Sequence, residues 1–163
     1  MWKTPLKKRP AKVYKCRVHI YQCRDLPSGD DDGMSDPYIK VWEQHDNTKT
    51  HCIEDNNNPI FFESLEIPVI EAESFDSIPP FILDAYDRDP LSSDDFIGRC
   101  IIPISEASYT EGDDIPVPKW HPCRVRPGAP PQGEILASFS IVASDYTFKE
   151  KANIGKTVKT KEF

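Results

Sequence analysis

The sequence lacks several features that would assign it to a large class of proteins at once. No apolar run approaches the ~18–20 residues that a membrane-spanning helix needs, and the N-terminus lacks the apolar centre of a secretory signal. There is no Gly-x-Ser-x-Gly motif and no glycine-rich phosphate loop, and no Cys/His pair has a convincing orienting partner. We therefore expect any membrane contact to be peripheral, and we do not expect an enzyme.

Glycine is scarce, with 7 residues against 16 prolines, and the 5 cysteines form no Cys-x-x-Cys pair. Abundant proline, together with few long polar helical stretches, favours a β-rich fold with many turns. An odd number of cysteines among apolar neighbours predicts reduced core thiols and a cytosolic environment. Zinc ligation by His51-Cys52 or His121-Pro122-Cys123 is a weaker alternative, because adjacent strand residues point to opposite faces.

The length of 163 residues fits one domain with tails, and the charge divides the chain in the same way. Residues 1–12 carry a net charge of +5 and residues 148–163 carry +3. Because the whole chain carries −7, a net charge of −15 is left for residues 13–147. Such an acidic domain is a poor nucleic-acid binder. We expect residues 1–12 and 148–163 to be linkers, which suggests a piece of a longer protein.

Short alternating runs predict strands. In residues 14–21, the side chains of Tyr14, Cys16, Val18 and Ile20 share one face, which is the period of a strand. Similar runs occupy 37–43, 49–54, 60–69, 80–86, 96–103, 117–122 and 133–143. The prediction is an all-β domain, an eight-stranded antiparallel β-sandwich over residues 13–147, with at most a short helix around 105–109.

Acidic residues gather in two of the predicted loops. They are Asp25, Asp30, Asp31, Asp32 and Asp36 after the first strand, and Asp87, Asp89, Asp94 and Asp95 after the fifth. Two unit charges 4 Å apart repel by ~1 kcal/mol in bulk water and by ~4 kcal/mol at an effective dielectric of 20. A cation would remove this cost, and calcium is the best candidate because it takes six to eight oxygen ligands in adaptable geometry. The competing interpretation is that these are merely solvated acidic turns.

Several motifs, in matching order and spacing, resemble the C2 domain, a calcium- and phospholipid-binding β-sandwich. They are Leu26-Pro27-Ser28-Gly29-Asp30, Ser35-Asp36-Pro37-Tyr38, Asn58-Pro59-Ile60-Phe61, Tyr86-Asp87-Arg88-Asp89 and Asp95-Phe96-Ile97-Gly98. The resemblance covers about residues 13–145 and implies a calcium site at one end of the sandwich. The five family ligands fall on Asp30, Asp36, Asp87, Asp89 and Asp95, all of them aspartate here. The implied cofactor is two or three Ca²⁺ ions.

Only one predicted strand precedes the first acidic loop, which resembles the type II strand order of the family. The runs 18–26, 96–100, 120–121 and 133–139 are similar to C2 domains of ferlins. This implies one module of a larger membrane-fusion or vesicle-trafficking protein, peripheral on the cytosolic side of membranes, with the isolated domain a monomer.

The resemblance implies that calcium bridges the acidic loops to an anionic phospholipid membrane. Met34, Arg88 and Leu91 are the loop-tip residues expected to contact that membrane. The run 51–55 is neutral to acidic, so strong phosphoinositide binding through that face is not expected. Two alternatives stay open: a calcium-independent protein-interaction domain, and a targeting domain that regulates an enzyme elsewhere in the full protein.

Overall fold

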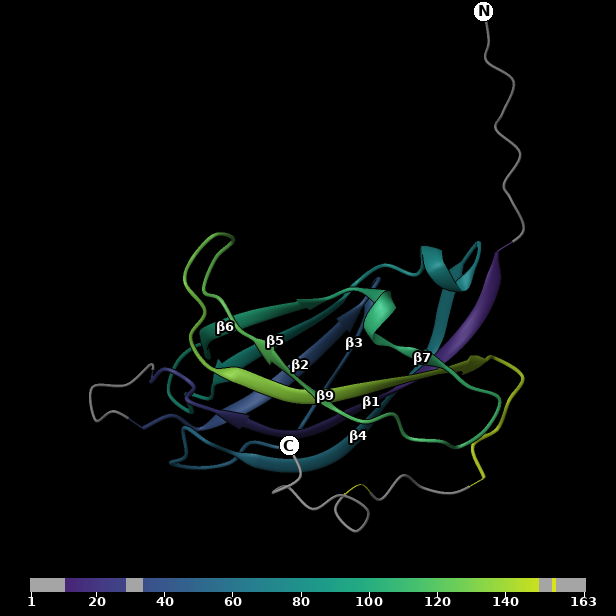
Figure 1. The fold of residues 1–163 in the computed structure, drawn as a ribbon. Coiled ribbons are helices and arrows are strands. Elements are labelled where there is room, and N and C mark those ends of the chain that lie inside the picture. The colour runs from purple at the N-terminus through teal and green to yellow at the C-terminus, as the bar shows by residue number, and fades with distance from the viewer. Residues whose placement is uncertain (1–10, 29–33, 150–153, 155–163) are drawn as a thin grey trace, which may run out of the picture.

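The computed structural model describes residues 11–28, 34–149 and 154. Two β-sheets face each other and enclose one hydrophobic core (Figure 1). The strands are β1 (Lys12–Arg24), β2 (Pro37–Glu43), β3 (Asp46–Lys49), β4 (Ile60–Ala72), β5 (Phe81–Asp87), β6 (Asp95–Ile102), β7 (Ser108–Tyr109), β8 (Lys119–Pro122) and β9 (Glu134–Ala143). Two 3-10 helices, η1 (Phe75–Ser77) and η2 (Ile104–Glu106), complete the described elements. The helices in this part of the chain have neither the length nor the apolar character of a membrane-spanning segment.

One sheet has the order β4-β1-β9-β7, with β8 also paired to β9, and the other has the order β3-β2-β5-β6. The alternation in β1 places Cys16, Val18 and Ile20 in the core. Phe81 of β5 and Phe139 of β9 stack across the core with ring centroids 4.7 Å apart. The alternating pattern therefore correctly predicts the β-sandwich, because each sheet must bury its apolar face against the other.

The details of the strands differ from the expectation in three places. A two-residue strand, β7, makes nine strands rather than eight, and it runs parallel to β9. The short helix expected at 105–109 is a 3-10 turn over Ile104–Glu106 followed by β7. The third strand spans 46–49 rather than 49–54, because a tight turn at Gln44, with φ of 54°, returns the chain at once.

The outer face of the five-stranded sheet carries a second apolar cluster. Tyr21, Leu136 and Ile154 are buried together there. Nearby, the guanidinium of Arg17 lies 3.5 Å from the ring centroid of Phe148. Residues 148 and 154, in the segment expected to be a linker, therefore contact the sandwich.

All five cysteines are free thiols, and four of them are buried, as the sequence predicts. The Sγ atoms of Cys100 and Cys123 lie 2.8 Å apart, joining β6 to the end of β8. The hydrogen bond between the two thiols, together with burial, raises the pKa of Cys100, so this thiol is unreactive at neutral pH.

Candidate functional site

Three connections meet at one end of the sandwich, on the left in Figure 1. We name them loop 1 (residues 25–36), loop 2 (residues 50–59) and loop 3 (residues 88–94), and residues 29–33 of loop 1 lie outside the described residues. Backbone hydrogen bonds tie them together, from Asn56 N to Ser35 O at 2.9 Å and from Arg88 N to Asp36 O at 3.0 Å. The two acidic loops are therefore neighbours, as the family resemblance implies.

Asp36 and Asp87 form the centre of this end. Asp87 is the last residue of β5, and its Oδ1 accepts a hydrogen bond from the backbone N–H of Asp36 at 2.8 Å. The Oδ1 of Asp36 in turn accepts one from the backbone N–H of Asp55 at 2.8 Å. These bonds fix the carboxylates of two loops against each other before any ligand is present.

The second carboxylate oxygen of Asp87 has an unusual environment. Asp87 is only 2% exposed, and no hydrogen-bond donor in the described part of the chain reaches its Oδ2. A buried charged oxygen without a partner costs free energy, and a cation is the partner that would remove this cost. The donor chemistry at this end, aspartate oxygen, is the kind that Ca²⁺ prefers.

Asp89 and Asp94 brace loop 3. The Asp89 carboxylate accepts bonds from the backbone N–H of Leu91 at 2.9 Å and the hydroxyl of Ser92 at 2.7 Å. Asp94 accepts one from the hydroxyl of Tyr38 at 2.5 Å and one from the Asp89 backbone N–H at 3.0 Å. The Ser92 hydroxyl lowers the pKa of Asp89, and the Tyr38 hydroxyl lowers that of Asp94. Both carboxylates are therefore ionised at neutral pH.

Of the other two expected calcium ligands, Asp95 and Asp30, only Asp95 lies among the described residues. Asp95 is exposed at the start of β6, where it is paired in register with Asp87. Asp30, with Asp31 and Asp32, lies outside the described residues. Within 11–28, 34–149 and 154, no group of three or more His, Cys, Asp or Glu side chains is close enough to hold a metal ion. The structure thus brings Asp36, Asp87 and Asp95 to one end of the sandwich without closing them into a ligand cage.

Asparagines of loop 2 have a role that the sequence pattern does not reveal. The Asn57 Oδ1 accepts a hydrogen bond from the backbone N–H of Ser35 at 3.0 Å, and the Asn58 Oδ1 accepts one from that of Asp25 at 2.9 Å. These contacts hold both ends of loop 1. The Asn56–Pro59 run indicates only a turn, because side-chain bonds to a loop more than twenty residues away leave no local signal.

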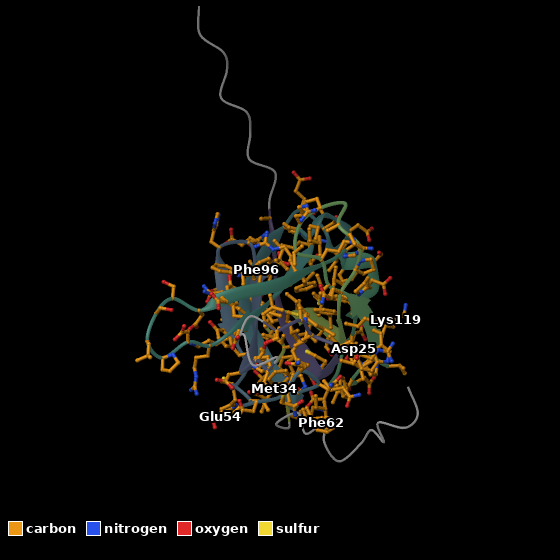
Figure 2. All side chains as sticks on the ribbon, turned by 90° about the vertical axis from the view of Figure 1, so that its left-hand side faces the viewer. Asp25, Met34, Glu54, Phe62, Phe96 and Lys119 are labelled. Atoms are coloured by element: carbon orange, nitrogen blue, oxygen red, sulfur yellow. The ribbon has the colours of Figure 1, made fainter. Side chains whose placement is uncertain are left out.

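The expected membrane-contacting residues lie on the same end. Met34 is 39% exposed and Leu91 is 95% exposed, and Arg88 forms an exposed ion pair with Glu54 at 3.4 Å. Figure 2 looks onto this end, with Met34 and Glu54 labelled on it. An exposed leucine and methionine beside acidic loops give this end both apolar and charged contact groups.

A β-sandwich with aspartate-rich loops at one end defines a class of small modules that present their loops to a ligand. A family model described as "C2 domain" matches residues 14–123, and the chain belongs to the C2 domain family.

Among known proteins, human myoferlin is 30% identical over 135 residues, which are 80% of this chain and 6% of that protein. The Arabidopsis thaliana multiple C2 domain and transmembrane region protein 6 is 32% identical over 123 residues, 73% of this chain and 11% of that protein. The chain therefore spans about a tenth or less of the length of these relatives and is similar to ferlin C2 domains.

Solved structures agree on the fold. A C2 domain of plant extended synaptotagmin 1 has a TM-score of 0.67 at 17% identity, covering 86% of this chain and 99% of that chain. A calcium-bound structure of two C2 domains of extended synaptotagmin 2 has a TM-score of 0.57 at 23% identity, covering 80% of this chain and 45% of that chain. These likenesses confirm the C2 sandwich that the sequence predicts.

Proposed function

We propose that this domain binds two or three Ca²⁺ ions and, through the loaded loops, an anionic phospholipid membrane. The proposed ligands are Asp30, Asp36, Asp87, Asp89 and Asp95. The observation that carries the proposal is the Asp87 carboxylate, which is buried between loops 1 and 3 with one oxygen lacking a donor among the described residues. The relationship to ferlin C2 domains supports it.

The chain's own residues would act by electrostatics. The Asp36 backbone N–H and the Asp55 backbone N–H hold the Asp87 and Asp36 carboxylates in place, so little ordering is left to do upon binding. Without a counter-charge, these loops repel an anionic surface within a Debye length of ~8 Å. Bound Ca²⁺ supplies positive charge and open coordination positions for phosphate oxygens.

The loop tips would add apolar anchorage to this contact. Leu91 projects almost fully into solvent, and Met34 is partly exposed on the neighbouring loop. Burying such a side chain in the acyl boundary contributes about 1.5–3 kcal/mol. Arg88, the first residue of loop 3, would face lipid phosphates. These three residues are the proposed membrane-contacting set.

The wider setting follows from the relatives. The chain matches only a small part of myoferlin, so we propose that it is one module of a longer ferlin-like protein that places it, as a monomer, at the cytosolic side of a membrane. A calcium-independent interaction with a protein is the competing function, as is targeting of an enzyme elsewhere in the full protein.

Calorimetric titration of the 163-residue chain with Ca²⁺ tests the proposal, with and without vesicles containing phosphatidylserine, at physiological salt. We expect heat from two or three sites and tighter binding when vesicles are present. Asp87→Asn should weaken binding at least tenfold. Asp76→Asn removes the same charge from η1, at the opposite end of the sandwich, and should leave binding unchanged. No heat at millimolar Ca²⁺ would overturn the proposal and leave the calcium-independent function.

A further inference from the structure

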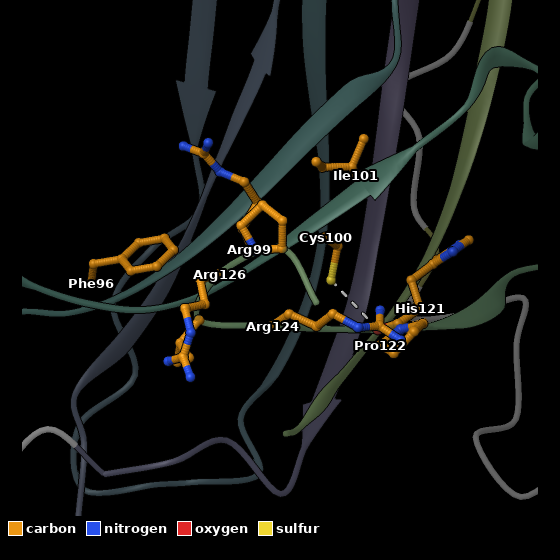
Figure 3. Close-up of a pocket in the computed structure, with 10 residues that line it drawn as sticks. Phe96, Arg99, Cys100, Ile101, His121, Pro122, Arg124 and Arg126 are labelled. Carbon is orange, nitrogen blue, oxygen red and sulfur yellow. Dashed lines mark hydrogen bonds between the residues drawn. The ribbon is translucent and has the colours of Figure 1, made fainter. Parts of the chain in front are cut away.

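A second candidate site lies on the seam between the two sheets, where β6 forms the edge of the four-stranded sheet and β8 pairs with β9 in the other. A pocket of about 480 Å³ opens there (Figure 3). Its lining includes three arginines, Arg99, Arg124 and Arg126, and no acidic residue. This is unexpected in a domain with a net charge of −15 over residues 13–147.

The backbone holds two of these arginines directly opposite each other. Arg99 and Arg124 form an isolated antiparallel bridge, with N-to-O distances of 2.8 and 3.0 Å in the two directions. Side chains at such paired positions stand about 4.5–5.5 Å apart at Cβ, and like charges there destabilise the pair. Two arginines at these positions therefore need a negatively charged group nearby to offset their repulsion.

The protein supplies an anion for only one of the pair. Asp84, which is buried, accepts hydrogen bonds from Arg99 Nε at 2.7 Å and Nη2 at 3.0 Å. Across the described residues, Arg124 and Arg126 have no carboxylate within ion-pair distance. Two guanidinium groups, each able to bind a carboxylate with a bidentate fork, thus remain available at the pocket.

Exposed apolar side chains lie beside the arginines in the lining. Ile101 is 61% exposed, and Phe96 and Val125 are also exposed beside it. Interfaces that bind well combine an apolar centre with arginines, which are enriched among the residues that contribute most to binding. The pocket therefore offers a contact for an apolar side chain with positive charge around it.

The floor of the pocket is fixed before any ligand arrives. Cys100 and Cys123 are in contact beneath it, and the thiol of Cys100 also lies 3.5 Å from the carbonyl oxygen of His121. The loop after Cys123 is closed by a hydrogen bond from Gln132 N to Cys123 O at 2.8 Å. A preformed floor reduces the entropy lost on binding.

We propose that this pocket docks an acidic peptide segment of a protein, with an aliphatic or aromatic side chain over Ile101 and Val125 and carboxylates on Arg124 and Arg126. The direction of the arginines favours a peptide over a single phosphate group. In Figure 3, Arg124 and Arg126 extend to different sides of the pocket, so separated carboxylates match them better than one small anion does. This interaction needs no calcium and is independent of the proposed membrane contact.

The test uses a fluorescein-labelled peptide, Glu-Asp-Leu-Glu-Phe-Asp-Glu, and the full 163-residue chain in the presence of EGTA. Binding is followed by fluorescence anisotropy, and its location by the amide resonances of the ¹⁵N-labelled protein. We expect shifts at Ile101 and at residues 124–126. Replacing every acid of the peptide by its amide, or its Leu and Phe by Ser, should each weaken binding at least tenfold.

The protein variant is Arg124→Gln with Arg126→Gln, whose thermal unfolding confirms that it is folded. It should bind the peptide at least tenfold more weakly. Lys12→Gln with Lys15→Gln changes the net charge equally on β1, and it should bind like the parent. Equal loss in both variants, or shifts that map elsewhere, would overturn the proposal. So would vesicles of phosphatidylserine and phosphatidylcholine that compete with the peptide in EGTA, since the pocket would then be a lipid contact.

Discussion

At the scale of single residues, Glu43 shows how much one buried carboxylate can influence stability. It is 1% exposed at the end of β2, and within the described residues neither of its oxygens has a hydrogen bond of ordinary geometry. Burial raises the pKa of Glu43 from 4.5 to about 8, against a smaller opposing effect of the Gln44 backbone N–H. The folded protein therefore keeps a proton that the unfolded chain releases.

This difference predicts a pH dependence of folding. Between pH 4.5 and about 8 the folded state holds more protons at Glu43, so its contribution makes stability fall as pH rises, by about 1.4 kcal/mol per pH unit at most. Glu43→Gln, which keeps the shape and cannot ionise, should remove this slope. Urea unfolding of parent and variant at pH 5, 6.5 and 8 measures it. Parallel stability curves for the two proteins would contradict the prediction.

Met34 and Leu91 carry a prediction about the membrane contact. Met34→Ser with Leu91→Ser should weaken binding to vesicles containing phosphatidylserine at least tenfold, because two apolar anchors of about 1.5–3 kcal/mol each are lost. Calcium affinity without lipid should not change, since neither side chain offers a carboxylate. Co-sedimentation and calorimetry measure the two quantities.

Exposed valines elsewhere provide the control for that experiment. Val69 and Val117 are both exposed, on β4 and before β8. Val69→Ser with Val117→Ser should leave vesicle binding as it is in the parent. Equal vesicle affinity for the Met34/Leu91 variant and the parent would show that the loop tips do not insert.

At the scale of elements, Gly133, which directly precedes β9, packs against the first residues of loop 1. Its φ is +79°, a conformation that side chains rarely adopt. A Cβ at this position would lie 3.0 Å from the carbonyl oxygen of Asp25 and 3.1 Å from the Cα of Leu26. The first acidic loop therefore leaves β1 against the backbone of Gly133, with no room for a larger residue.

Gly133→Ala should destabilise the domain by about 1–3 kcal/mol, since it adds a close backbone contact to the cost of a positive φ. Gly128→Ala is the matched control, because its φ is +80° but no atom lies within 4 Å of the added Cβ. The free energy of unfolding of this control should fall only by the cost of the positive φ, about 1 kcal/mol. Chemical denaturation compares the two variants, and an equal loss in both would show that the contact with loop 1 is unimportant.

The sequence predicts the elements well where burial alternates with period two, as in β1 and β9, because such strands leave their pattern in the chain. It fails at β3, where Asp46 and Asn47 are poor strand formers held by a tight turn. Residues 50–53, which the sequence places in a strand, do form hydrogen bonds to β2, from Thr50 N to Ile39 O and from Ile53 N to Pro37 O. These two bonds do not continue into the regular pairing of a strand.

The same contrast holds for the sites. The acidic loops are visible in the sequence because their aspartates cluster locally. The arginine pocket is not, since Arg99 and Arg124 are brought together only by a bridge between segments far apart in the chain. The bracing role of Asp94 is equally hidden, because its bond partner, the Tyr38 hydroxyl, lies on β2, far away in the sequence.

At the scale of the whole molecule, negative charge is concentrated at the loop end, where a bound cation would lower the electrostatic cost. The acidic sandwich gathers Asp36, Asp87 and Asp95 at one end, with one buried oxygen of Asp87 lacking a donor among the described residues. A ligand that binds only the folded state stabilises it by about 2.7 kcal/mol at a hundredfold excess over its dissociation constant. Calcium binding at this end must therefore be visible in the unfolding of the entire domain.

We expect the melting temperature of the chain to rise with free Ca²⁺, and Asp87→Asn with Asp89→Asn to abolish the rise. In EGTA the same variant should unfold at a temperature equal to or above that of the parent, because it relieves repulsion between carboxylates. A lower temperature would instead mean that the hydrogen bonds from Asp36 N to Asp87 and from Ser92 to Asp89 outweigh that repulsion. Calorimetric scans over a Ca²⁺ series, with Asp76→Asn as the control, separate these results. A melting temperature of the parent that does not change up to millimolar Ca²⁺ would exclude a calcium site at this end. The proposal for the arginine pocket is tested in EGTA and does not depend on this result.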